Sequence, residues 1–233
     1  MLLDHVVLFV DDLEDAVDTF SQQGFTVTPG GVNGPTHNAL IAFANETYIE
    51  LIALQSRKKR LLLRLLGQLG LLRVLSPKNR NLNTRLLSWF SGSQGFTDIC
   101  LRVVSLEAFA STPPEALGAL TPVTAFKRHR PDGIHVSWRL AGAVDLMQPF
   151  FIEDDTPLNY RIPDGPSRHH ANGSQGITEL ITRSELSVRP ENAIIRTSVA
   201  SSRSKFSIGI TTTGLAKEIP LGREYNADIR LIN

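Results

Sequence analysis

The chain has 233 residues, of which 42% are hydrophobic and 20% are charged, and its formal net charge is +1. These values are ordinary for a soluble globular protein with one large domain or two small ones, and no uncharged apolar stretch is long enough to span a bilayer. A single cysteine, Cys100, excludes an internal disulfide, and Asp4, Asp11 and Asp12 interrupt the first apolar run. We therefore expect no signal peptide and a cytoplasmic location.

The first 54 residues predict the element order β-α-β-β-β. An apolar strand begins at Leu2, and a helix follows with Asp12 as its N-terminal cap and Gly24 just beyond its end. A short strand and a glycine-rich loop in FTVTPGGVNG then precede two further strands, in THNALIAF and TYIELIAL.

The first of these strands carries a histidine, His5, although both of its faces are mostly apolar. A buried imidazole needs a partner, because an unpaired polar group outside water is costly. From the strand alone two interpretations stay open. One is a core histidine bonded to a backbone carbonyl, and the other is a metal ligand or proton carrier.

A second stretch, residues 95–153, repeats the order of elements. GFTDICLRV predicts a strand, SLEAFASTPPEALGAL a helix divided by two prolines, TAFKRHRPDGIHVSWRL a hairpin with its turn at PDG, and DLMQPFFIE an apolar strand. Residues 154–233 contain a connection rich in proline and glycine and then GITELIT, SSRSKFSIGITTT and YNADIRLI. We interpret this last part as a partial third unit with further strands.

Between the two units, residues 55–94 form a basic, leucine-rich insertion. No acidic residue occurs between Glu50 and Asp98, whereas nine lysines and arginines do. The stretch SRKKRLLLRLLGQLGLLRVL is helical in character, although two glycines weaken it. We expect residues 56–90 to dock on the sheet through leucines or to cover the site as a lid, with a solvated basic face. A contact with anionic membrane is the less favoured alternative.

The stretches LDHVVLFVDDLEDAVDTFSQQGFTVTPGG and THNALIAFANETYIELIAL, with RPDGIHVSWRL, MQPFFIE and HHANG later in the chain, together resemble the glyoxalase-like branch of the vicinal oxygen chelate superfamily. The resemblance covers residues 1–54 and about 95–180. It implies an α+β fold, in which tandem βαβββ modules at 1–54 and 95–153 form a curved, barrel-like mixed sheet around a concave site. The basic helical insertion and an additional C-terminal β-rich part would complete the chain.

In metal-using members of this superfamily, one residue in the first strand and one in the last strand of each module bind a divalent cation. The resemblance therefore implies a ligand set at the matching places: His5, Glu50, Asp98 and Gln148. Such an oxygen-rich set suits Mg²⁺, Mn²⁺ or Fe²⁺ better than zinc, and no organic cofactor is expected. The alternative is a buried pair of His5 and Glu50 that is structural or holds a substrate.

Four further residues are candidates for substrate binding. His37 and Asn38 match a polar pair that faces the pocket in this branch. Arg102 would bind an anionic substrate or else pair with Asp98 on the same strand face. Trp138 would stack on a ligand or pack in the core.

The implied activity is that of a glyoxalase-like lyase, isomerase or dioxygenase that acts on a small oxygen-bearing molecule, with a divalent metal where one is bound. Glu50 and His170 are the candidates to move a proton, His170 if its loop folds over the cavity. A non-catalytic binding module of the same fold is the alternative. The expected partner is a small molecule, an anionic one if Arg60 and Arg64 of the insertion reach it. Nucleic acid is not expected, and homodimerisation stays open.

Overall fold

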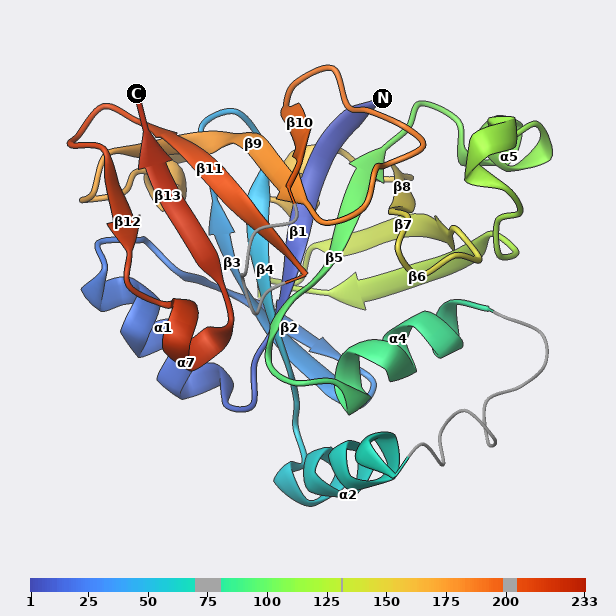
Figure 1. The fold of residues 1–233 in the computed structure, drawn as a ribbon, viewed down its shortest axis with the longest axis horizontal. Helices are drawn as coiled ribbons and strands as arrows, with labels where there is room; N and C mark the ends of the chain where they lie inside the picture. The colour runs from blue at the N-terminus through green and yellow to red at the C-terminus, as the bar shows by residue number, and fades with distance from the viewer. Residues whose placement is uncertain (70–80, 131, 199–204) are drawn as a thin grey trace.

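The computed structural model describes residues 1–69, 81–130, 132–198 and 205–233, and these fold around two β-sheets (Figure 1). The first unit has the order β-α-β-β-β, in β1 (Leu2–Phe9), α1 (Leu13–Gln22), β2 (Thr28–Asn33), β3 (Thr36–Ala42) and β4 (Tyr48–Leu54). The insertion contains α2 (Arg57–Gln68) and α4 (Leu82–Ser91). The second unit repeats the order in β5 (Gly95–Arg102), α5 (Leu106–Ser111), β6 (Thr124–His129), β7 (His135–Gly142) and β8 (Phe150–Asp154).

The two units form one eight-stranded sheet in the order β2-β3-β4-β1-β5-β8-β7-β6. Within each unit the first and last strands are parallel, as in β1 with β4 and β5 with β8, and the units join where β1 runs antiparallel to β5. The sheet is strongly curved and barrel-like. The predicted fold class, with tandem βαβββ modules in one curved mixed sheet, is confirmed.

The C-terminal part forms the second sheet. A connection with α6 (Leu158–Arg161) leads to β9 (Ser174–Thr182), β10 (Ile194–Thr197), β11 (Phe206–Thr212), β12 (Lys217–Ile219), α7 (Gly222–Tyr225) and β13 (Asp228–Ile232). The strand order is β10-β9-β11-β13-β12. The start of the stretch SSRSKFSIGITTT, predicted to be a strand, lies outside the described residues, and β11 occupies the rest of it. The predicted additional β-rich part is therefore present.

The two sheets share a hydrophobic core, which packs against one face of β1. Phe96 of β5 stacks on Phe206 of β11, with ring centroids 5.0 Å apart. Leu8 and Ile208 belong to the same buried cluster. The other face of β1 belongs to a second cluster, in which Val7 packs with residues of α4. The first strand is thus covered on both faces, which accounts for its nearly continuous apolar sequence.

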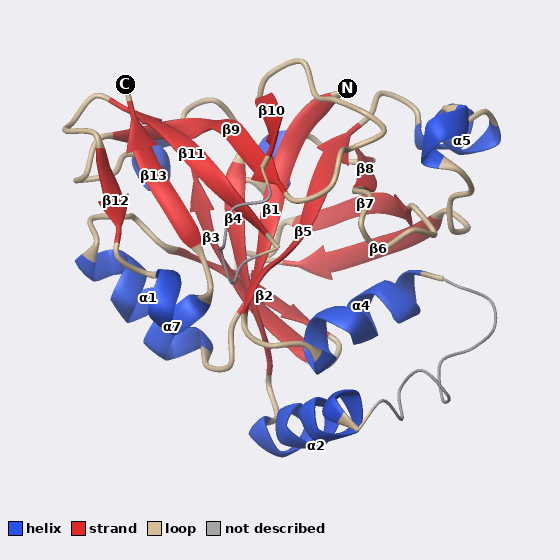
Figure 2. Ribbon diagram, viewed as in Figure 1, coloured by secondary structure: helices blue, strands red, loops and turns tan. Residues whose placement is uncertain are grey.

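Helices lie at the periphery of the sheets, and α2 lies next to α4 (Figure 2). Among the described residues, no helix has both the length and the hydropathy needed to cross a membrane.

Strand β2 differs from the prediction, because it runs through the glycine-rich stretch that was expected to be a loop. A β-bulge between Pro29 and Gly31 lets the strand continue, and Gly31 has a φ of +134°, which favours glycine. A Cβ on Gly30 would lie 2.2 Å from Oδ1 of Asn38. The glycines therefore allow β2 to pack closely against the side chain of Asn38 in β3.

Candidate active site

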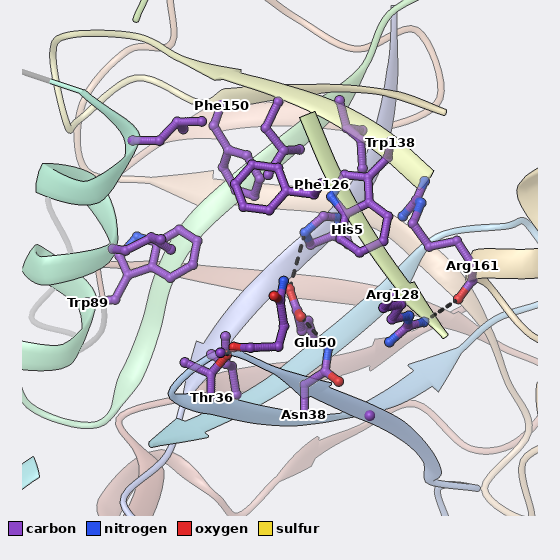
Figure 3. A pocket seen from close by; sticks show the side chains of 18 of the residues that line it. His5, Thr36, Asn38, Glu50, Trp89, Phe126, Arg128, Trp138, Phe150 and Arg161 are labelled. Atoms are coloured by element: carbon purple, nitrogen blue, oxygen red, sulfur yellow. Dashed lines mark hydrogen bonds and ion pairs between the residues drawn. The ribbon is translucent and has the colours of Figure 1, made fainter. Parts of the chain in front are cut away.

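The concave face of the first sheet and helix α4 form a pocket of about 250 Å³ between them (Figure 3). Much of its wall is aromatic: Trp89, Phe90, Phe126, Trp138 and Phe150. Polar side chains also line it, among them His5, Thr36, Asn38, Tyr48, Glu50, Arg85, Arg128 and Arg161. An apolar wall with a few polar groups is typical of a site for a small organic ligand.

A β-bulge brings the side chains of Asp4 and His5 together. In the pairing of β1 with β5, Leu3 lies opposite Leu101 and His5 lies opposite Cys100, so Asp4 is the extra residue. A bulge interrupts the alternation of side chains along a strand and can redirect one of them. Nδ1 of His5 lies 2.7 Å from Oδ1 of Asp4, and both side chains are buried.

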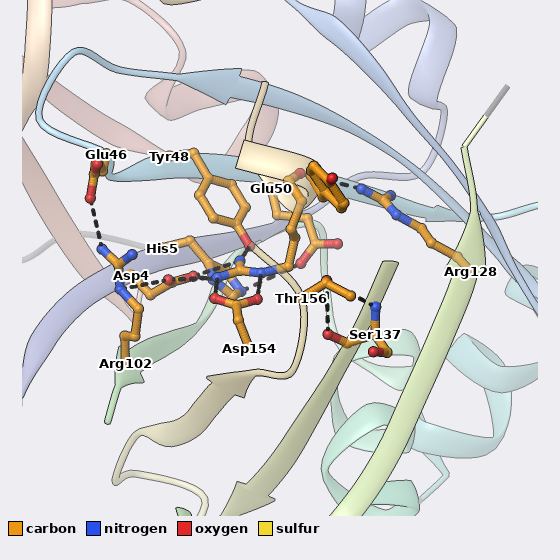
Figure 4. Close-up of polar contacts among 12 residues, drawn as sticks. Asp4, His5, Glu46, Tyr48, Glu50, Arg102, Arg128, Ser137, Asp154 and Thr156 are labelled. Atoms are coloured by element: carbon orange, nitrogen blue, oxygen red, sulfur yellow. Dashed lines mark hydrogen bonds and ion pairs between the residues drawn. The ribbon is translucent and has the colours of Figure 1, made fainter. Parts of the chain in front are cut away.

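Arg161 holds Asp4 in its ionised form. Its Nη1 and Nη2 atoms donate to the two oxygens of Asp4 over 2.9 and 2.8 Å, and Nη1 also donates to the Tyr48 hydroxyl (Figure 4). Burial alone would raise the pKa of Asp4, but the charge of Arg161 and hydrogen bonds from His5 and Arg161 keep that pKa well below its ordinary value. An ionised carboxylate only accepts hydrogen bonds. Nδ1 of His5 therefore carries the proton, and Nε2 is the nitrogen available to the pocket.

Glu50 of β4 meets His5 in the pocket. Its Oε2 atom lies 3.6 Å from Nε2 of His5, and its Oε1 atom accepts a hydrogen bond of 2.5 Å from Nδ2 of Asn38. The ring of Tyr48 stacks on the imidazole of His5, with the two ring centroids 4.4 Å apart. The imidazole is thus fixed by a stacked ring and lies between two carboxyl groups.

Arg128 of β6 brings positive charge to the pocket wall. Its Nη1 atom donates to the carbonyl of Gly30 over 2.6 Å, and its guanidinium lies 5.9 Å from the ring centroid of Trp138. Burial lowers the pKa of Arg128 from its ordinary value, although Tyr48 and Glu50 oppose this effect. A partly desolvated guanidinium is well suited to stabilise negative charge on a bound oxygen.

The donor atoms of Asp4, His5 and Cys100 lie within 4.8 Å of one another, as those of a metal site would. Their surroundings do not fit a cation, however. Both oxygens of Asp4 already accept from the guanidinium of Arg161, whose positive charge would repel a metal ion. Burial raises the pKa of the Cys100 thiol well above its ordinary value, whereas a metal ligand must be a thiolate.

The four residues predicted as a metal-ligand set are not brought into one pocket. His5 and Glu50 line the pocket together, but Asp98 and Gln148 do not. Both oxygens of Asp98 accept from Nη1 of Arg85, over 2.8 and 2.7 Å. The Gln148 amide bonds to backbone atoms of residues 185 and 187. The set stays a prediction that this placement does not support.

The predicted substrate-binding residues divide in the same way. Asn38 and Trp138 line the pocket, but His37 and Arg102 do not. His37 precedes Asn38 in β3, and neighbouring residues of a strand point to opposite faces. Nε of Arg102 lies 3.5 Å from Oδ2 of Asp4, so this arginine pairs with the carboxylate that also contacts His5.

His170 does not line the pocket either. The backbone N–H of Thr26 donates to its Nδ1 over 3.0 Å, and its Nε2 lies 3.0 Å from the carbonyl oxygen of Ala42. Its ring also packs on Phe25 and Phe43, with centroids 5.8 and 5.0 Å away. Both ring nitrogens of His170 thus contact backbone atoms of the first unit. The residue therefore holds the 156–173 connection against that unit.

Sequence reasoning missed four residues around the site: Asp4, Tyr48, Arg128 and Arg161. Asp4 offered a signal, since a second buried polar residue next to His5 in an apolar strand suggests a mutual partner. Arg128 and Arg161 lie far along the chain in a hairpin and a connection, where arginines are ordinarily solvated. Nothing in their local sequence indicated that the fold would bury them beside β1.

The two helices of the insertion differ in what they contact. Helix α4 covers the pocket, as a lid would, and its Leu82, Leu86 and Trp89 line it. Helix α2 was expected to dock through leucines, and its Leu63 does pack against the second core cluster. Arg60 also holds α2 in place, since its guanidinium binds Asp11 and the carbonyls of residues 90 and 92. Neither Arg60 nor Arg64 lines the pocket, so neither can reach an anionic ligand there.

Two βαβββ modules that share one sheet and surround one pocket are the architecture of the vicinal oxygen chelate superfamily. Within it, the model of a family described as "Glyoxalase-like domain" matches residues 3–193, and the chain belongs to that family. Its fold is similar to that of a hypothetical protein from Staphylococcus aureus, known from a crystal structure, with a TM-score of 0.69 and 17% identity over 99% of this chain and 98% of that one. A search of curated proteins finds no match.

Proposed function

We propose that the protein is a glyoxalase-like enzyme that transfers a proton on a small, largely apolar molecule with an oxygen-bearing end. The observation that carries the proposal is the placement of His5 between Asp4 and Glu50 at the wall of an aromatic pocket. A carboxylate that orients an imidazole and stabilises its charged form is a recurrent device of acid–base catalysis.

In the proposed reaction, Nε2 of His5 takes a proton from a carbon next to a carbonyl group. The electron pair of the broken C–H bond moves into an enolate, whose oxygen is stabilised by the guanidinium of Arg128. The imidazolium is stabilised by Asp4 on one side and Glu50 on the other. In an α-hydroxy carbonyl substrate, the hydroxyl proton passes to the enolate oxygen, and return of the proton from His5 to the former carbonyl carbon completes an isomerisation. In a substrate with a β-substituent, the electron pair of the enolate instead expels that substituent, which leaves with the proton from His5, and the reaction is that of a lyase. Neither route needs a co-reactant.

The substrate class follows from the size and lining of the pocket. A pocket of about 250 Å³ lies just below the usual range of ligand sites, roughly 300–1,000 Å³, so the ligand is small. Trp89, Phe126 and Phe150 offer flat apolar surfaces for an apolar or aromatic body.

The test is untargeted mass spectrometry of a metabolite extract incubated with the protein in heavy water. We expect the wild type to convert a compound and to introduce deuterium into it, and Glu50→Gln and His5→Gln to do so about 10²–10⁴ times more slowly. Prior treatment with EDTA should leave the conversion unchanged.

Two outcomes would contradict this proposal. Loss of conversion with EDTA and its recovery with Mg²⁺ or Mn²⁺ would mean that a metal carries the chemistry. A compound that binds the wild type and is released unchanged, without deuterium, would favour the non-catalytic binding module, which the aromatic wall also suits.

A further inference from the structure

Helix α2 presents a row of leucines to solvent. Leu61, Leu65 and Leu69 have exposed fractions of 70%, 51% and 63%, and Leu62 beside them is 55% exposed. In a helix with about 3.6 residues per turn, residues four apart lie on one face, so the first three form a continuous stripe. Scattered exposed leucines are ordinary, but a stripe on one helix is a contact surface.

The orientation of α2 is fixed, so these leucines cannot simply turn inward. Arg60 on the opposite side is buried, where its Nε donates to Asp11 over 2.6 Å and its guanidinium lies 4.6 Å from the centroid of the Phe9 ring. Gly67 allows α2 to approach α4 closely, since a Cβ there would lie 2.8 Å from the carbonyl oxygen of Ser91. Burial of the arginine thus forces the leucines outward.

Basic side chains lie around the leucine stripe. Lys58 and Lys59 are exposed at the start of α2, and Arg57 and Arg64 are exposed while paired with Asp12 and Asp11. The sequence contains no acidic residue from position 51 to position 97. An apolar stripe with a basic border is the pattern of a helix that lies in the surface of an anionic membrane.

We propose that α2 docks the protein on anionic lipid surfaces, with Leu61, Leu65 and Leu69 inserted among the acyl chains and Lys58 and Lys59 at the headgroups. A second copy of the chain is the other candidate occupant. It would bring the basic borders of two α2 helices together, and such like charges repel, whereas an anionic lipid surface attracts them.

The docking surface is adjacent to the pocket. Residue 55, which precedes α2, donates hydrogen bonds from its side chain to the carbonyls of Gly34 and Thr36, and both of these residues line the pocket. On its other side α2 packs against α4, the cover of the pocket. Membrane docking would therefore place the pocket and its cover near the lipid surface, where a largely apolar ligand concentrates.

The test is co-sedimentation with vesicles of phosphatidylcholine alone and with added phosphatidylglycerol. We expect wild-type protein to bind only the anionic vesicles, and less at high salt. Leu61→Gln/Leu65→Gln/Leu69→Gln and Lys58→Glu/Lys59→Glu should each weaken this binding at least tenfold. Leu215→Gln, which changes a leucine that is 86% exposed elsewhere, is the matched control and should bind as the wild type does.

Circular dichroism and thermal unfolding of the leucine variant should match the wild type, because the changed side chains are already exposed. The proposal is overturned if the wild type does not bind anionic vesicles, or if the leucine variant binds them equally well. It is also overturned if the wild type is a dimer that the leucine changes dissociate and no vesicle binding occurs. None of these results depends on conversion of a substrate.

Discussion

The histidine of the first strand, His5, lies between two carboxyl groups, and each of its ring nitrogens faces one of them. Asp4 accepts from Nδ1, and Glu50 lies near Nε2 in the pocket. The sequence alone left a structural role and a chemical role for His5 as alternatives. In the structure, Nδ1 makes the buried contact with Asp4 while Nε2 lies toward Glu50, so the proposed chemical role of His5 would use the second nitrogen.

Arg161 binds both oxygens of Asp4, so loss of this arginine should destabilise the protein strongly. Its guanidinium binds Asp4 and Asp154 in a buried cluster. We expect Arg161→Met to lower the free energy of unfolding by about 3–5 kcal/mol, because it leaves buried carboxylates without a positive partner. Urea denaturation measures this loss. Arg139→Met, which breaks ion pairs of a side chain that is 24% exposed, should have a much smaller effect, and equal losses would contradict this expectation.

His170 should make stability depend on pH. Burial lowers the pKa of His170 from its ordinary value of 6.5, although the hydrogen bond to Ala42 opposes this effect. The unfolded chain therefore binds the proton at a higher pH than the folded chain does, and stability falls as pH drops from about 6.5 through the lower folded pKa. Thermal unfolding at pH values from about 5 to 8 tests this. His170→Gln should show a weaker decline toward acid pH, and an unchanged decline would show that other groups cause it.

At the scale of elements, α4 depends on a buried ion pair for its position over the pocket. Arg85 is 1% exposed and binds both oxygens of Asp98, while Trp89 donates to the same carboxylate over 2.8 Å. In the second unit this arginine supplies the positive charge at the place where the family resemblance suggested a metal. The insertion has nine basic residues, and its sequence did not reveal that Arg60 and Arg85, among those that the structure describes, would be buried.

We expect Arg85→Met to destabilise the protein by about 3–5 kcal/mol, because Asp98 would remain as a buried, uncompensated charge. Adding Asp98→Asn should restore part of this loss, since a neutral amide needs no cation and can still accept from Trp89. Denaturant titrations of the single and double variants measure both effects. No recovery in the double variant would mean that the packing of α4, rather than charge, dominates.

At the scale of the whole molecule, local patterns were sufficient to predict the two βαβββ units and the strands β9, β11 and β13 of the C-terminal part, but not β10 and β12. Such signals join residues that are close in sequence. The Asp12 cap and the predicted hairpin, formed by β6 and β7, are both present, although Pro131 of its PDG turn lies outside the described residues. The site was less predictable. Glu50 and Asn38 follow from strand pairing, but Arg128 and Arg161 reach the pocket only through tertiary packing that no local signal encodes.

We also expect divalent metal ions to leave the stability of the whole molecule unchanged. A ligand that binds only the folded state raises the unfolding temperature in proportion to the logarithm of its concentration. Because Arg161 and Arg85 occupy the carboxylates that a cation would need, we expect neither Mg²⁺ nor Mn²⁺ to raise the unfolding temperature, and EDTA not to lower it. A stabilisation that grows with Mn²⁺ and is lost in Glu50→Gln would instead establish a metal site.

The most direct test of the central claim, that Asp4 holds His5 with Nε2 toward the pocket, is the ¹⁵N NMR spectrum of the imidazole side chains at neutral pH. The signals of His5 are assigned by their absence in His5→Gln. We predict a proton on Nδ1 of His5, held by the hydrogen bond to Asp4. The same result is expected for untreated protein and for protein from which added Mg²⁺ or Mn²⁺ has been removed. A His5 with its only proton on Nε2 would contradict the account, because Nδ1 could not then donate to Asp4 and Nε2 could not take a proton from a substrate.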